Sequence, residues 1–166
     1  MNRRLPAYIL ALFWFSLDRA TKLLVEAYLG REDVVAVIPG FFNLVYAQNR
    51  GMAFSLLSEG ESEWRSFFLL GLTALITALV ASILWQTAAS GLASSPLART
   101  GLALILGGAL GNLYDRLAYG AVLDFLDFYL GRWHWPAFNL ADAGLTVGAG
   151  LVVLDFSRSR RKEARR

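Results

Sequence analysis

The side chains best suited to chemistry in this chain are carboxylates, because the sequence holds no cysteine and a single histidine, His134. Thiolate nucleophiles are therefore excluded. A single histidine also leaves little basis for serine–histidine catalysis and is too few for a multi-histidine metal site. Two carboxylates in a partly dry site share one proton, since both cannot ionise cheaply. The ionised group can take a proton from water while the protonated group polarises a peptide carbonyl. This aspartic protease chemistry needs neither a metal nor a cofactor, and we predict neither.

Two aspartates are functional candidates because they lie among apolar residues. Asp124 follows Val122 and Leu123 in an apolar stretch, and Asp142 has no basic residue after it until Arg158. An unpaired acid in such surroundings is costly, which favours a functional role. Paired acids alone remain a weak signal, because ion-coupled transporters hold them as well.

Polar side chains also recur three and four residues apart in three apolar segments, a spacing that puts them on one face of a helix. The competing interpretations are a structural ion pair between Asp18 and Lys22 and interhelical hydrogen bonds from the asparagines. Asp127 is interpreted as solvated and His134 as interfacial. The three polar stripes consist of Asp18, Thr21 and Lys22, then Asn112, Asp115 and Arg116, then Asn139 and Asp142.

The composition indicates where these stripes lie. The 166 residues are 56% hydrophobic and only 17% charged, with a mean hydropathy of +0.46. A soluble domain of this size could not bury so much apolar surface, so we predict one integral membrane domain over residues 1–166. The net charge of +3 comes from the two ends of the chain. Basic ends indicate membrane topology, and nucleic acid is excluded as a partner because no basic face is evident.

The fold predicted is an all-α membrane protein, a four-transmembrane-helix bundle with a small extracytoplasmic β-sheet and a surface loop or helix. The spans are expected at about residues 6–28, 66–86, 97–116 and 137–156. A signal peptide is the alternative for the first span, but no A-x-A-like cleavage site follows it. Four spans and basic ends place both termini in the cytoplasm. The three polar stripes then meet at the extracytoplasmic face, next to outer segments at about 30–65 and 117–136.

Smaller patterns refine this fold. The β-branched run Val34–Ile38 and the run Phe41–Tyr46 flank a Pro-Gly turn, which predicts a hairpin. Tryptophans and Tyr129 in the second outer segment suit an interfacial aromatic belt. Small residues four apart predict close packing of the third and fourth helices, and these residues are Gly107, Gly111, Gly144 and Gly148.

Four motifs, taken together, resemble those of bacterial lipoprotein signal peptidase, also called signal peptidase II. They are DRATK at 18–22, NRGMAF at 49–54, GGALGNLYDR at 107–116 with GAVLDF at 120–125, and FNLAD at 138–142. Each motif alone is modest, but the four in this order and spacing cover nearly the whole chain.

The resemblance implies an aspartic endopeptidase of the bacterial inner membrane. Its substrates would be prolipoproteins that carry diacylglycerol on the lipobox cysteine, and it would cut just before that cysteine. It also implies contact with membrane lipids and inhibition by the cyclic peptide globomycin.

Carried over residue by residue, the resemblance makes Asp124 and Asp142 the catalytic pair. Asp115 competes with Asp124, but its neighbour Arg116 favours a structural or supporting role. The substrate-binding or site-supporting set is Asp18, Lys22, Asn49, Gly51, Asn112, Asp115, Arg116 and Asn139.

Two other classes of membrane protein remain to be weighed. A small ion- or proton-coupled transporter would explain buried acids, but it usually shows internal repeats or broken helices, which are not found here. Intramembrane proteases of the presenilin or prepilin-peptidase kind use a Gly-x-Gly-Asp signature, which is absent from this sequence.

Overall fold

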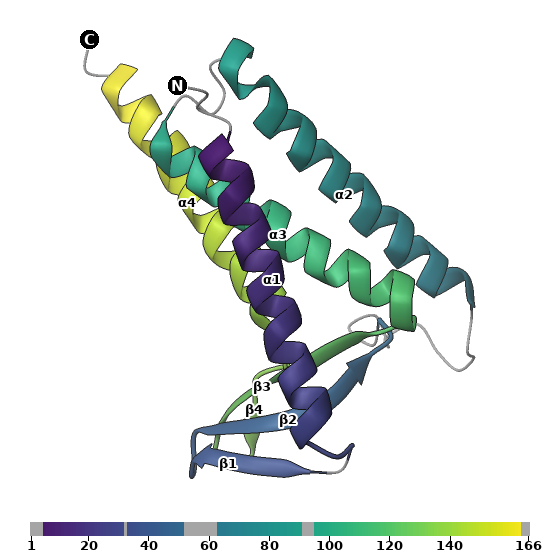
Figure 1. Ribbon diagram of the computed structural model, residues 1–166. Coiled ribbons are helices and arrows are strands. Elements are labelled where there is room, and N and C mark those ends of the chain that lie inside the picture. The colour runs from purple at the N-terminus through teal and green to yellow at the C-terminus, as the bar shows by residue number, and fades with distance from the viewer. Residues whose placement is uncertain (1–4, 32, 52–62, 91–94, 164–166) are drawn as a thin grey trace.

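The computed structural model describes residues 5–31, 33–51, 63–90 and 95–163. Within these residues, four long helices carry an antiparallel four-stranded sheet at one end (Figure 1). The start of α1 and the end of α4 lie at the opposite end from the sheet. The helices are α1 (Leu5–Tyr28), α2 (Glu63–Ser90), α3 (Pro96–Tyr119) and α4 (Leu140–Glu163).

Local sequence signals explain where α3 and α4 begin and end. The Ser95 hydroxyl accepts a hydrogen bond from the Ala98 amide at the start of α3, and Gly120 ends that helix in the left-handed conformation with φ +70. The last helix differs from its expected range of 137–156. It begins at Leu140 because Asn139 caps it. It continues to Glu163 because residues 157–163 include no proline or glycine to end it.

Glycines let the helices approach closely, as predicted. They lie at the predicted contact between α3 and α4 and also where these two helices pack against α1. A Cβ on Gly101 would lie 2.6 Å from the Gly148 carbonyl oxygen, so α3 and α4 touch backbone to backbone. Gly107 and Gly144 instead face α1. A Cβ at Gly107 would lie 2.6 Å from the Ala11 oxygen, and one at Gly144 would overlap the indole of Trp14.

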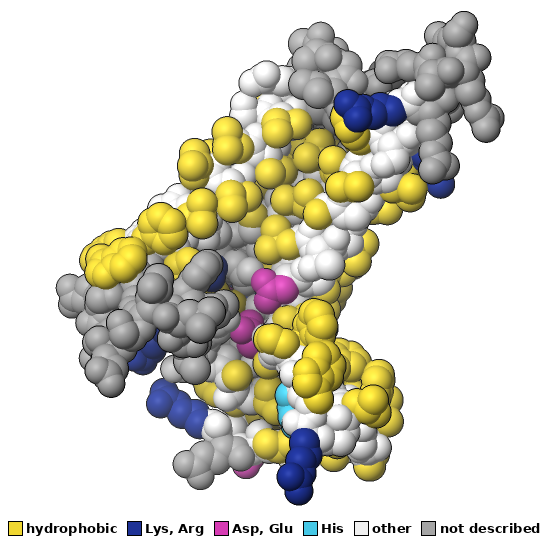
Figure 2. Space-filling view, turned by 180° about the vertical axis from the view of Figure 1, so that it is seen from behind, with side chains coloured by type: hydrophobic (Ala, Val, Ile, Leu, Met, Phe, Trp, Pro, Cys, Tyr) yellow, Lys and Arg dark blue, Asp and Glu magenta, His cyan; other side chains and the backbone are white. Residues whose placement is uncertain are grey.

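The outer surface of the helices is apolar. α2 exposes Phe67 at 69% and Leu75 at 56%, and α1 exposes Leu12 at 61%. Figure 2 shows such side chains covering the helical part of the molecule. Among the described residues, two helices are long and apolar enough to cross a membrane, over Ser66–Gln86 and Leu140–Arg160. Apolar surface of this extent is the signature of a protein that lies in lipid.

The sheet has the order β1 (Val34–Ile38), β2 (Phe42–Asn49), β3 (Val122–Leu130) and β4 (Trp133–His134). The predicted hairpin is confirmed, and its second strand runs three residues further than expected. The second outer segment, for which no strand is predicted from the sequence, supplies β3 and β4 of the sheet. Residues 122–130 alternate apolar and polar side chains poorly, so only their pairing with the distant β2 reveals a strand. That pairing sets Asn49 opposite Val122.

Candidate active site

Asp124 lies on β3 with only 3% of its surface exposed. Each of its carboxylate oxygens accepts a hydrogen bond from an asparagine amide. Asn49 Nδ2, at the end of β2, donates to Oδ2 over 3.0 Å. Asn139 Nδ2, which precedes α4, donates to Oδ1 over 2.7 Å. The ionised form of Asp124 is therefore held by one donor on each oxygen.

Asp142 lies in the first turn of α4, where its own helix cap orients it. Asn139 Oδ1 accepts from the Asp142 amide over 3.0 Å, and Asp142 Oδ2 accepts from the Asn139 amide over 3.4 Å. This reciprocal pattern is a capping box, which satisfies two backbone donors that a helix start leaves unpaired. From α3, Asn112 Nδ2 donates to Asp142 Oδ1 over 2.8 Å.

Asn139 brings the two predicted catalytic aspartates together. Its side chain is fully buried. Its Nδ2 donates to the Asp124 carboxylate, and its Oδ1 accepts from the backbone amide of Asp142. The backbone of Phe138 bonds to Leu126 of β3, which ties the strand of Asp124 to the start of α4. Asn139 therefore links the carboxylate of Asp124 on β3 to the start of the helix that carries Asp142, 18 residues later in the sequence.

A second polar cluster lies near this pair, and its members Asp18, Lys22 and Asp115 are buried. Lys22 Nζ lies 2.8 Å from Asp18 Oδ2 and 2.7 Å from Asp115 Oδ2, so one ammonium group joins α1 to α3. Arg19 forms an ion pair with Asp115 as well. Asp18 Oδ1 accepts from the backbone amide of Ala141, one residue before Asp142. The cluster thus holds the start of α4 against α1 and α3.

The ion pairs of Asp115 are made with Arg19 and Lys22 of α1. Arg19 was missed as a site residue, although it stands inside the DRATK motif; an arginine next to Asp18 in an apolar helix was the available signal.

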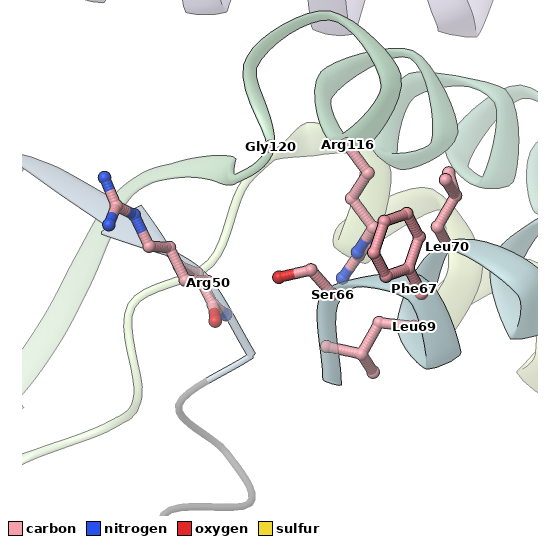
Figure 3. A pocket seen from close by; sticks show the side chains of 8 residues that line it. Arg50, Ser66, Phe67, Leu69, Leu70, Arg116 and Gly120 are labelled. Carbon is pink, nitrogen blue, oxygen red and sulfur yellow. The ribbon is translucent and has the colours of Figure 1, made fainter. Parts of the chain in front are cut away.

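Arg116 instead lines a pocket of about 190 Å³ beside the aspartates. Its Nη1 donates to the Asn112 carbonyl oxygen over 3.3 Å. Figure 3 shows the pocket between the end of β2, the first turns of α2 and the end of α3. The α2 residues were not foreseen, because nothing in a long apolar run marks which side chains face a site. The pocket is lined by Asn49, Arg50, Ser66, Phe67, Leu69, Leu70, Arg116 and Gly120.

Burial raises the pKa of Asp124 to about 6. The nearby carboxylate of Asp142 also raises this pKa, while the amides of Asn49 and Asn139 and the charge of Lys22 lower it. A carboxyl group with a pKa near 6 is a stronger base than an ordinary aspartate, and it is still largely ionised at neutral pH. Figure 2 shows acidic side chains in the hollow between the helices and the sheet.

The sheet holds a further polar group outside this site. Asp127 was expected to be solvated, and this was wrong. Asp127 is buried, accepts from Asn43 Nδ2 over 2.9 Å, and lies 2.9 Å from His134 Nδ1. The side chain of His134 is 52% exposed and stacks on Tyr129. Within the described residues, no three His, Cys, Asp or Glu side chains gather as metal ligands would.

Of the predicted site residues, all ten lie in the described part of the chain. Residues 52–54 of the NRGMAF motif and the rest of the outer segment up to residue 62 lie outside the described residues.

The sequence model of the family described as signal peptidase (SPase) II matches residues 10–158. This chain belongs to the signal peptidase II family. The lipoprotein signal peptidase of Solibacter usitatus (strain Ellin6076) is 44% identical over 161 residues, 97% of this chain and 96% of that protein. That of Nitratidesulfovibrio vulgaris (strain DP4) is 47% identical over 142 residues, 86% and 83% of the two chains. The likeness indicated by the four sequence motifs is confirmed.

A solved structure has a similar fold. A bacterial membrane enzyme determined by the in meso method at 1.9 Å resolution is 27% identical to this chain, with a TM-score of 0.77. The match covers 91% of this chain and 92% of the other. The arrangement of helices and sheet in this chain therefore also occurs in a bacterial membrane enzyme.

Proposed function

We propose that this chain is a membrane aspartic endopeptidase that removes signal peptides from prolipoproteins, with Asp124 and Asp142 as its catalytic pair. Membership of the signal peptidase II family supports the reaction, since members are named for prolipoprotein processing. The observation that carries the residue assignment is Asn139, whose side chain hydrogen-bonds the Asp124 carboxylate and the backbone amide of Asp142. Asp115 is not assigned to the pair, because Arg19 and Lys22 neutralise it.

The two aspartates divide the hydrolysis between them. The ionised carboxylate takes a proton from a water molecule, and the resulting hydroxide attacks the carbonyl carbon of the scissile peptide bond. The protonated carboxyl donates its proton to the carbonyl oxygen, which gives a neutral tetrahedral intermediate. The C–N bond then breaks as the carbonyl re-forms: the protonated carboxyl gives its proton to the leaving nitrogen, and the ionised carboxylate takes the proton of one hydroxyl of the intermediate. Asn49, Asn112 and Asn139 keep both carboxyls oriented throughout.

The substrate carries two acyl chains, which stay in lipid, so it enters sideways from the bilayer. Its lipidated cysteine follows the cleaved bond, and the pocket beside Arg116 offers both cationic and apolar walls next to the aspartates. The supporting set comprises Asp18, Lys22, Asn49, Gly51, Asn112, Asp115, Arg116 and Asn139. The cyclic peptide globomycin is expected to inhibit cleavage.

The topology that suits this reaction has four membrane spans, as one domain in the bacterial inner membrane. The start of α1 and the end of α4 share one end of the bundle, which supports placing both termini on the cytoplasmic side (Figure 1). The sheet and the aspartates then face outward, where translocated prolipoproteins arrive. A coupled ion transporter is not favoured, because the family is one of peptidases.

The deciding experiment is a gel-shift assay with a diacylglyceryl-modified prolipoprotein and purified enzyme in lipid. Asp124→Asn and Asp142→Asn should each lower kcat by roughly 10³-fold or more, as removal of one member of a catalytic unit does. Asp127→Asn changes a buried aspartate that lies in the sheet outside the site, so it should retain cleavage and provides the matched control. Near-normal processing by Asp124→Asn protein would refute the assignment and promote Asp115. Globomycin should abolish the shift, whereas ion flux through proteoliposomes without cleavage would favour a transporter.

A further inference from the structure

We propose that Gly51 is a positioning residue, which fixes the orientation of the Asn49 amide so that an N–H group always faces Asp124. This inference rests on the proposed function, because it concerns how the catalytic aspartate is held. The proposed function lists Gly51 only as a supporting residue, and this inference gives that glycine a specific task.

The hydrogen bonds around Asn49 leave its amide a single favourable orientation. Asn49 Oδ1 accepts from the Gly51 backbone N–H over 2.8 Å, and Asn49 Nδ2 donates to Asp124 Oδ2 over 3.0 Å. An asparagine side chain has one acceptor end and one donor end. Rotating the amide by half a turn would set Oδ1 against the carboxylate and Nδ2 against the Gly51 N–H. Both new contacts would be repulsive, so the Gly51 amide selects the donor for Asp124.

Only glycine fits at this point of the chain. Gly51 has φ +99, a conformation that strains any residue with a Cβ. A Cβ placed on Gly51 would also lie 2.4 Å from Leu69 Cδ1 of α2, a side chain that lines the pocket. The turn therefore needs glycine both for its backbone shape and for the close approach of α2.

Loss of this orientation should change how Asp124 titrates. The Asn49 hydrogen bond lowers the pKa of Asp124, so a disordered Asn49 amide raises that pKa above about 6. The other charged groups around Asp124 come from three helices and stay in place: Asp142 from α4, Lys22 from α1 and Arg116 from α3. The acid limb of the pH profile, where activity falls as Asp124 gains a proton, then moves to higher pH.

The test compares Gly51→Ala, Asn49→Ala and the double variant Gly51→Ala/Leu69→Ala, in which the steric overlap with Leu69 is removed. The double variant is measured against Leu69→Ala alone. Each variant affecting Gly51 or Asn49 should lower kcat roughly 10- to 100-fold, the loss expected for one hydrogen bond to a charged group. KM should stay within about twofold, and the acid limb should move upward. Adding Gly51→Ala to Asn49→Ala should cause no further shift.

Gly40→Ala is the matched control. Gly40 lies in the β1–β2 turn with φ +84, and a Cβ there would meet nothing within 4 Å. It carries the same kind of backbone strain away from the aspartates, so kcat and the acid limb should be unchanged. If Gly51→Ala acted only by loosening the fold, it would resemble Gly40→Ala in its pH profile.

An infrared titration of the Asp124 carboxyl, assigned by its absence from Asp124→Asn, separates this inference from the proposed function. A shift in the Gly51 and Asn49 variants supports the positioning role even if the unaltered chain fails to cleave prolipoprotein, an outcome that would defeat only the proposed function. An unchanged titration and acid limb in Asn49→Ala, or in the double variant, would overturn the positioning role even in an active peptidase.

Discussion

The buried charge cluster depends on a glycine in the facing helix, and Gly111→Ala should therefore be strongly destabilising. A Cβ on Gly111 would lie 2.4 Å from Asp18 Oδ2 and 3.1 Å from Asp18 Cγ. Ordinary contacts need about 3.5 Å, so the carboxylate must move by about 1 Å. Asp18 would then lose its position against Lys22, at 2.8 Å, and against the Ala141 amide, at 2.9 Å.

The size of the effect follows from what this movement breaks. Disrupting one side of a buried ion pair costs about 3–5 kcal/mol, and replacing glycine by alanine within a helix returns about 1 kcal/mol. The net loss is about 2–4 kcal/mol, or roughly 5–15 °C in melting temperature for a chain of this length. Thermal unfolding followed by tryptophan fluorescence in detergent micelles, at one fixed scan rate, measures it.

Two further variants make the measurement decisive. Gly150→Ala is a matched control in α4, where a Cβ would meet nothing within 4 Å, and it should be neutral or slightly stabilising. In an Asp18→Ala background the obstacle is gone, so adding Gly111→Ala should cost nothing more. Equal melting temperatures for Gly111→Ala and Gly150→Ala would refute the reasoning.

Two other predictions concern the aspartates and their asparagine. Burial raises the pKa of folded Asp124 from 3.8 to about 6, so the folded chain holds this proton more tightly than the unfolded chain does. Its contribution to stability is complete below pH 4 and is lost as pH rises through about 6, so the chain should lose on the order of 2–3 kcal/mol relative to Asp124→Asn between pH 4 and pH 8. If the difference in melting temperature between the unaltered chain and Asp124→Asn did not change with pH, this prediction would be wrong. Asn139→Ala should lower the free energy of unfolding by about 1 kcal/mol, because the cap of α4 is lost, and should remove most of the activity. Asn139→Ser should restore the cap and its stability but stay inactive. If both variants were as active as the unaltered chain, Asn139 would have no role in the reaction.

The helices could be predicted from the sequence because their signals are local. A run of uncharged residues over Ser66–Trp85 is enough to indicate a spanning helix, whatever it packs against. The ends were less certain, since α4 begins where the Asn139 side chain caps it rather than where apolar residues start. The strand β3 was missed because its partner β2 lies more than 70 residues earlier in the chain.

The sequence by itself determined the chemistry available to this protein. The absence of cysteine, a single histidine and a few acids among apolar residues left carboxylates as the catalytic groups, and four motifs in register named the family. Residue types and their order are fixed before folding, so these conclusions needed no coordinates.

Only the tertiary structure decided which polar groups meet. Asp115 and Asp124 were both candidates on sequence, and their partners differ because α1 brings Arg19 and Lys22 to the first while β2 and Asn139 bring amides to the second. Hydrogen bonds and ion pairs act over about 3 Å, whereas residues that make them, such as Asp18 and Ala141, lie as far as 123 positions apart in the chain. The physical environment of each aspartate is therefore a property of the fold.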